Sequence, residues 1–306
     1  MPDDVLPSVQ LIDTRFMGQT GTIGAYLLKG PDGAAALIET GPTSTQGALL
    51  DGIRAAGVDP AHIADVLVTH IHLDHSGGAG VLLRDAAPQA RVHVHPVGLP
   101  HLVDPSKLLR SAARLYGDAM DTLWGEVAPI AEERVVALED NARIRLAGHD
   151  VEILFTPGHA AHHVAIRHLP TGAVFAGDAA GVRVPGAGVI NPPTVPPEFD
   201  LDAWEATIDR ILSVDPTALL LVHYGRYDDG RAHLEELRRR LRAWTAYVRD
   251  GLAAGRTTQE MGQELQHRDA ATPGVGEEGA GRLSLIAGYG ISVAGIARYL
   301  EKRAAQ

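Results

Sequence analysis

The chain of 306 residues contains no cysteine. This absence excludes disulfide bonds, thiolate metal ligands and cysteine nucleophiles together. Any metal site must therefore be built from histidine and carboxylate side chains, and the sequence holds 15 histidines.

Long apolar runs and positive charge are also scarce. No segment approaches the roughly 20 consecutive apolar residues of a membrane-spanning helix. The N-terminal segment MPDDVLPSVQ lacks the basic stretch and apolar run of a secretory signal. The net charge of −11, from 27 basic and 38 acidic residues, disfavours a nucleic-acid partner, because phosphate backbones bind clustered Lys and Arg. We expect a cytoplasmic protein with a small-molecule substrate and no membrane partner.

The periodicity of apolar residues predicts an α/β protein. Strands are expected at 24–29, 34–39, 66–69, 91–95, 143–147, 151–155, 164–168, 173–176 and 218–222. Helices are expected at about 45–56, with Thr43, Ser44 or Thr45 as cap, at 77–87 and at 201–213, while 97–136 is mostly helical in pattern. The stretch 181–200, with five prolines, reads as a loop.

Beyond residue 231 the pattern is helical only. Thr257 and Glu260 form a capping-box pattern, and the glycine-rich segment 274–281 is expected to separate that helix from a last one near 290–303. The basic run RRRLR at 238–242 lies beside two glutamates and is predicted to be a solvated helix face. We therefore expect a domain at 1–228 and a helical extension at 229–306.

Four potential metal ligands lie within six residues, directly after the apolar strand 66–69: His70, His72, Asp74 and His75. Burying so many polar side chains without partners would cost about 1–3 kcal/mol for each. Metal ions would satisfy them, so the segment predicts a metal site.

This HxHxDH segment resembles the signature of the metallo-β-lactamase superfamily. Over about residues 10–228 the chain follows the order of that family, because Thr156-Pro157-Gly158-His159, Gly177-Asp178 and His223 resemble its second, third and fourth motifs. The resemblance implies a four-layer αββα sandwich, with residues 1–228 as the catalytic domain.

The resemblance also implies the ligand sets. One metal would be held by His70, His72 and His159, the other by Asp74, His75 and His223, with Asp178 bridging the two. Two divalent ions can share a water and lower its pKa, which yields a bridging hydroxide as nucleophile. Asp74 and Asp178 would then be the catalytic carboxylates, Asp74 orienting the nucleophile. Zinc is the default metal, with iron and manganese as alternatives.

Three further side chains are expected next to these ligands. His163 is expected to orient a ligand by a hydrogen bond, Glu39 stands where many relatives carry an aspartate behind the ligands, and Tyr224 is a candidate contact to the leaving group. The remaining histidines, among them His93, His95, His149 and His168, are expected on strand or helix surfaces, and His162 is given no role.

The seven-ligand set resembles glyoxalase II-like thioesterases and lactonases. The expected activity is therefore hydrolysis of a small ester, thioester or lactone by a metal-dependent hydrolase. Three alternatives stay open: a persulfide dioxygenase-like oxidoreductase with a single iron, a metal-dependent phosphodiesterase or nuclease, and a ligand-binding regulator. The apolar C-terminal helices make a homodimer a candidate assembly.

Overall fold

The computed structural model describes residues 3–186 and 188–305, and only the backbone of Asp32. The chain forms two compact units. The first comprises residues up to 155 together with 162–175, and the second comprises 156–161 and 176–305. The predicted loop 181–200 is thus described apart from residue 187, and the predicted boundary between residues 228 and 229 stays a prediction.

The first unit contains a sheet whose strands follow the order of the chain. The strands are β1 (Asp3–Leu6), β2 (Val9–Asp13), β3 (Gly24–Lys29), β4 (Ala35–Ile38), β5 (Ile63–Leu67), β6 (Arg91–Val94) and β7 (Val135–Ala137). The strands β1 to β4 pair antiparallel, whereas β4, β5, β6 and β7 run parallel. The hairpin predicted at 24–39 is confirmed.

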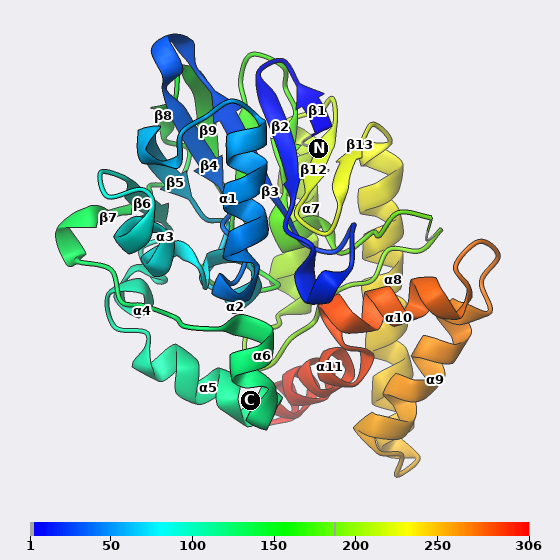
Figure 1. The fold of residues 1–306 in the computed structure, drawn as a ribbon. Coiled ribbons are helices and arrows are strands. Elements are labelled where there is room, and N and C mark those ends of the chain that lie inside the picture. The colour runs from blue at the N-terminus through cyan, green and yellow to red at the C-terminus, as the bar shows by residue number, and fades with distance from the viewer. Residues whose placement is uncertain (1–2, 187, 306) are drawn as a thin grey trace. The chain divides into compact units, whose positions relative to one another are not determined.

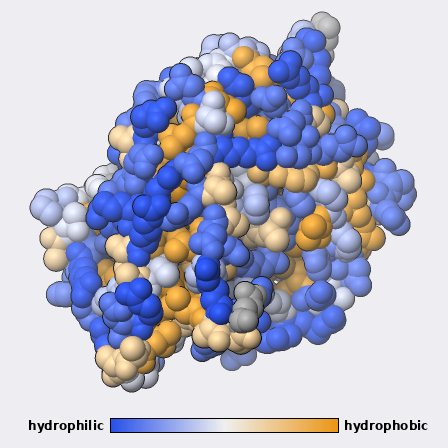
Figure 2. All heavy atoms as spheres, turned by 180° about the vertical axis from the view of Figure 1, so that it is seen from behind, coloured by the Kyte–Doolittle hydropathy of each residue, from blue (hydrophilic) through white to orange (hydrophobic). Residues whose placement is uncertain are grey.

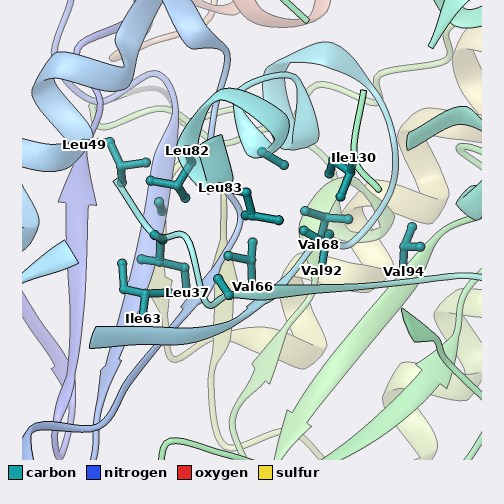
Figure 3. Close-up of a cluster of buried hydrophobic side chains, with 14 of the residues drawn as sticks. Leu37, Leu49, Ile63, Val66, Val68, Leu82, Leu83, Val92, Val94 and Ile130 are labelled. Carbon is teal, nitrogen blue, oxygen red and sulfur yellow. The ribbon is translucent and has the colours of Figure 1, made fainter. Parts of the chain in front are cut away.

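Six helices belong to the same unit: α1 (Gln46–Ala55), α2 (Leu73–Ser76), α3 (Ala79–Asp85), α4 (Leu99–Val103), α5 (Ser106–Tyr116) and α6 (Met120–Trp124), as far as the described residues show. Figure 3 shows Leu49 of α1 and Leu82 and Leu83 of α3 gathered with strand residues such as Leu37 and Val66. Each such buried aliphatic side chain contributes about 1.5–3 kcal/mol. This core fixes the carboxyl end of β5, where HxHxDH begins.

A second set of strands in this unit runs β11 (Val174–Phe175), β10 (Val164–His168), β9 (His149–Phe155) and β8 (Arg143–Leu146), all antiparallel. The predicted hairpin at Pro170-Thr171-Gly172 joins β10 to β11, as expected. The rings of Tyr26 on β3 and Phe175 on β11 meet edge to face, 5.0 Å between centroids, so the two sheets of the unit pack together here.

The second unit is mostly helical (Figure 1). It contains η7 (Gly177–Ala180), α7 (Leu201–Ser213), the antiparallel pair β12 (Leu219–Leu221) and β13 (Gly225–Tyr227), and then α8 (Gly230–Ala253), α9 (Thr258–Ala270), α10 (Gly276–Ala287) and α11 (Tyr289–Ala304). The helices α9 and α11 pack on each other and α11 packs on α8. The C-terminal helical region is confirmed, and so is the capping box of Thr257 and Glu260.

Several local predictions were wrong. Residues 125–131 are not helical and β7 follows them, while β1, β2 and β13 were not predicted. The glycine-rich segment begins helix α10 instead of ending a helix, because Ala280 and Leu283 are buried there. Thr45 precedes α1, but its hydroxyl donates to the carbonyl of Pro42, 2.9 Å away, and caps no helical N–H.

The basic run on α8 is only partly a solvated face. Arg239 and Arg242 are exposed and pair with glutamates. Arg240, in contrast, is largely buried, donates to both carboxylate oxygens of Asp269 and lies over the ring of Trp244. The carboxylate of Asp269 also accepts a hydrogen bond from the hydroxyl of Tyr289, so this ion pair joins three C-terminal helices.

Surface and membrane features agree with the composition. Figure 2 shows one face on which hydrophilic residues predominate and apolar residues lie in scattered patches. Within residues 3–186 and 188–305, no helix taken singly is long and apolar enough to cross a membrane. The pair α10 and α11, bent by 51°, meets the length and composition test only when both helices are taken together.

Candidate metal centre

The HxHxDH segment lies in the first unit, just beyond β5. Residues 69–72 are irregular, and α2 begins at Leu73. The short helix turns the chain back on itself, so that the backbone N–H groups of His75 and Ser76 donate to the carbonyl of His72. The ring centroid of His70 consequently lies 4.5 Å from that of His72 and 4.0 Å from that of His75.

Glu39 determines how the His70 ring is protonated. Its Oε1 atom accepts hydrogen bonds from both the backbone N–H and the hydroxyl of Thr69. The Thr69 oxygen, 3.0 Å from His70 Nδ1, must then accept from that nitrogen. This assignment from hydrogen-bond partners leaves Nε2 of His70 without a proton. That nitrogen lies 3.0 Å from Nδ1 of His72, so two ring nitrogens converge as a ligand pair.

The same carboxylate oxygen orients His75. Nδ1 of His75 lies 3.3 Å from Oε1 of Glu39 and donates to it, which leaves Nε2 of His75 as an acceptor. That Nε2 atom lies 3.6 Å from Oδ2 of Asp74, and the His75 side chain is fully buried. Asp74 and His75 therefore form a second candidate ligand pair, and the buried Glu39 carboxylate contacts His75 directly and His70 through Thr69.

Two further histidines of the first unit surround His70. The ring of His163 lies 5.0 Å from that of His70, and His162, which was given no role, lies 6.1 Å from His70 and 5.7 Å from His72. Both are buried. The orienting hydrogen bond of His163 stays a prediction.

The second unit brings together the other three expected ligands. Oδ2 of Asp178 lies 3.4 Å from Nε2 of His159, and Oδ1 of the same carboxylate lies 3.5 Å from Nε2 of His223. All three side chains are buried. One carboxylate thus presents each of its oxygens to a different imidazole.

His159 is positioned by its neighbours in this unit. Its Nδ1 donates to the carbonyl of Pro193 at 2.6 Å, so Nε2 faces Asp178 as an unprotonated acceptor. The Trp204 ring packs edge to face on His159 at 5.7 Å. Gly158 is required beside it, because a Cβ there would lie 2.4 Å from Cα of Trp204. The loop behind Pro193 is held in turn by the Thr194 hydroxyl, which donates to the carbonyl of Ser292 on α11.

Two side chains that the sequence did not suggest support Asp178. The indole N–H of Trp204 donates to the carbonyl of Ala179 at 2.8 Å, and Nε2 of His233 on α8 donates to the carbonyl of Ala180 at 2.7 Å. Burial lowers the pKa of His233 to about 4, so the ring is neutral. No local sequence motif marks either residue, because each lies on a helix that comes well after Asp178 in the chain.

The placement of other histidines on surfaces was wrong in part. His93, His95 and His168 are buried. The Thr171 hydroxyl lies 2.7 Å from Nδ1 of His168, whose Nε2 lies 3.0 Å from Nδ1 of His149. His149 donates from Nε2 to the carbonyl of Lys29. Burial lowers the pKa of His168 to about 4, which suits a chain of neutral rings.

Comparison with known proteins decides the family. A family model described as the metallo-β-lactamase superfamily matches residues 21–223, more than half of the chain. The chain belongs to this superfamily. Its members are mostly hydrolases and its fold implies divalent metal binding; all seven expected ligands are among the side chains that could hold a metal ion. The predicted family is confirmed.

Individual relatives in the superfamily are distant. The chain is 29% identical over 163 residues to a metallo-β-lactamase fold-containing protein of Sulfurisphaera tokodaii, covering 52% of this chain and 60% of the relative. It is 30% identical over 117 residues to the hydroxyacylglutathione hydrolase of Pseudomonas paraeruginosa, covering 38% of this chain and 33% of that enzyme. The matches therefore span less than two thirds of either relative.

A solved structure matches over almost the whole chain. The crystal structure of a metallo-β-lactamase family protein from Thermus thermophilus has a TM-score of 0.73 at 23% identity, covering 99% of this chain and 96% of that one. At this identity the likeness concerns the fold, and it confirms the predicted metallo-β-lactamase fold with its C-terminal helices.

Proposed function

We propose that the protein is a dinuclear metal-dependent hydrolase acting on a small ester, thioester or lactone. His70, His72 and His159 hold one ion, Asp74, His75 and His223 hold the other, and Asp178 binds both.

The observation that carries the proposal is the orientation of the Asp178 carboxylate. Its two oxygens face the Nε2 atoms of two different histidines, at 3.4 and 3.5 Å. The first unit likewise offers two separate pairs, one of two ring nitrogens and one of a ring nitrogen with a carboxylate oxygen. Histidine nitrogen and carboxylate oxygen suit zinc, iron and manganese, of which zinc is our first choice.

Two ions bound in this way would supply a hydroxide nucleophile at neutral pH and polarise a carbonyl oxygen. The protein's own side chains would set the geometry. Glu39 keeps His70 and His75 in the tautomers that direct Nε2 to the ligand position, and the Pro193 carbonyl does so for His159. Asp74, which is partly exposed, would orient the nucleophile, and Tyr224 is proposed to contact the leaving group.

The substrate class is supported by the relatives and by charge. Several relatives are hydroxyacylglutathione hydrolases, which suggests cleavage of an acyl group from a carrier. The net charge of −11 disfavours a polyphosphate substrate. The cytoplasmic location, the absence of nucleic-acid and membrane partners, and the homodimer stay predictions.

The test is metal content per chain, measured by elemental analysis of protein purified without chelators. We expect about two ions in the wild type, and a loss of at least one in Asp178→Ala together with loss of ester and thioester hydrolysis. A single iron that Asp178→Ala leaves in place would overturn the proposal and favour oxygen chemistry on a sulfur substrate.

A further inference from the structure

Three aromatic rings from distant parts of the first unit meet near the HxHxDH segment. The Trp124 ring, at the end of α6, stacks on Phe16 with 5.6 Å between centroids. The ring of Tyr116, at the end of α5, meets Trp124 edge to face at 5.0 Å. Phe16 lies in η1 (Phe16–Gly18), a short turn in which Met17 has a positive φ of 52°.

The segment 40–45 connects this cluster to the ligand-bearing helix α2. On one side, the backbone N–H of Thr40 donates to the carbonyl of His75 at 2.9 Å. On the other side, the Ser44 hydroxyl donates to the carbonyl of Leu123 at 2.6 Å, one residue before Trp124. The rings therefore stand beside the same short helix that carries Asp74.

Tyr116 is the titratable ring of the cluster, and the charge of Asp74 acts on it. Burial, and secondarily the negative charge of Asp74, raise the pKa of its phenol above the usual value. The ring is half-buried, and no group in the described part of the chain hydrogen-bonds to the hydroxyl.

The cluster is continued by apolar side chains that face solvent. Met17, next to Phe16, is 46% exposed, and Leu115, next to Tyr116, is 39% exposed. The segments that carry them lie around η3 (Thr43–Thr45), on which η1 packs directly and α5 packs through α6. Exposed apolar side chains beside a candidate site indicate a surface that a ligand covers.

Trp124 itself is a poor choice for stability alone. The indole is 6% exposed, and its Nε1–H has no hydrogen-bond acceptor among residues 3–186 and 188–305. A buried donor without an acceptor destabilises the fold, and a phenylalanine would stack without it. The large indole is expected to support the half-buried Tyr116 ring, which packs on it edge to face.

We propose that Tyr116, Met17 and Leu115, supported from behind by the buried rings of Phe16 and Trp124, form an apolar subsite that binds the acyl chain of the substrate beside Asp74. The inference rests on the proposed hydrolase function and specifies its substrate as an acyl ester or thioester with a chain of several methylene groups. Short acyl groups such as acetyl would leave the exposed part of the subsite uncovered.

The test is a chain-length series of p-nitrophenyl esters and acyl thioesters, from acetyl to decanoyl. Each methylene group that becomes buried is expected to raise kcat/KM about threefold to fourfold, until the subsite is filled. Leu115→Ser and Met17→Ser should flatten this dependence, lowering the decanoyl-to-acetyl ratio at least tenfold. Both side chains are exposed, so the variants are expected to fold. Leu252→Ser, a matched change at the end of α8 in the other unit, should keep the wild-type ratio.

A ring-conserving variant tests the account of Trp124. Trp124→Phe loses the indole N–H that has no acceptor among the described residues, and it is expected to be at least as heat-stable as the wild type. Wild-type protein that hydrolyses acetyl and decanoyl substrates equally well would overturn the subsite and leave the hydrolase proposal standing.

A binding measurement covers the opposite case, in which no acyl substrate is hydrolysed and the proposed function fails. Decanoate should then still change the tryptophan emission of the wild type but not that of Trp124→Phe, and acetate should change neither. Decanoate without effect on the wild-type emission would overturn the subsite as well.

Discussion

Glu39 is the residue whose replacement tests the reasoning about the ligands most directly. Its Oε1 atom accepts from the backbone N–H of Thr69, from the Thr69 hydroxyl and from Nδ1 of His75. Through Thr69 it also fixes the proton on His70. One carboxylate oxygen thus orients one member of each ligand pair in the first unit.

The expected magnitude follows from these contacts. Glu39→Gln keeps an acceptor oxygen but loses its charge, and a hydrogen bond to a charged group contributes about 1 kcal/mol more than a neutral one. Replacing a group that orients metal ligands lowers metal affinity by about 10–100-fold. Glu39→Ala would leave three buried donors without an acceptor, at about 1–3 kcal/mol each, a large share of a typical unfolding free energy of roughly 5–15 kcal/mol.

The assay is zinc affinity by competition with a chromophoric chelator, combined with thermal unfolding of the metal-free protein. We expect Glu39→Gln to bind zinc about 10–100-fold more weakly while the metal-free protein loses little stability. Glu126→Gln is the matched control, because Glu126 is exposed and pairs with Arg84 at the surface. Zinc affinity of Glu39→Gln within twofold of the wild type would refute the assignment of the tautomers.

Three further predictions concern stability. Burial lowers the pKa of His168 to about 4, so between pH 6.5 and 4 this histidine takes up a proton only in the unfolded chain. The unfolding free energy of the wild type should therefore fall by about 3 kcal/mol as the pH drops through this window. Denaturation of the metal-free proteins at pH 7 and pH 4.5 should show a smaller fall for His168→Gln than for the wild type. Gly158→Ala should lower the unfolding free energy by about 1–3 kcal/mol, measured by urea titration, because its Cβ meets Trp204; an unchanged midpoint would contradict the contact. Arg240→Met should cost about 3–5 kcal/mol, since it leaves the buried Asp269 carboxylate uncompensated, whereas Arg239→Met on the exposed face should cost under about 1 kcal/mol.

The part of the candidate site whose residues are neighbours in the chain could be predicted from the sequence. HxHxDH is recognisable because four ligand-type side chains follow one apolar strand within six residues. His159, Asp178 and His223 each follow an apolar strand and needed the family's motif order to be connected. The positions of these single residues carry no signal on their own.

The groups that support the ligands could not be predicted, for a physical reason. His233 donates to the carbonyl of Ala180 from a helix 53 residues further along the chain, and Trp204 donates to the carbonyl of Ala179 from α7. The contact of His149 with His168 depends on the antiparallel pairing of β9 and β10. Such contacts depend on tertiary structure, which apolar periodicity does not encode.

Local propensity was also overridden by packing in the C-terminal region. Glycine disfavours a helix by about 1 kcal/mol per residue relative to alanine, and this argued for a break at 274–281. The structure has α10 there, because Gly279, Ala280 and Leu283 are buried against neighbouring helices. The burial of one apolar face outweighs the unfavourable glycines.

The close packing of α11 on the loop of Pro193 and Thr194 determines which substitutions in α11 the protein tolerates. At Gly295 on α11 a Cβ would lie 1.8 Å from the carbonyl oxygen of Thr194, next to the proline whose carbonyl orients His159. In a random mutagenesis screen for lost activity, substitutions at this inconspicuous glycine should therefore appear alongside those of the ligands themselves. Substitutions in α11 would thus be limited by their effect on His159, which lies more than 100 residues earlier in the chain.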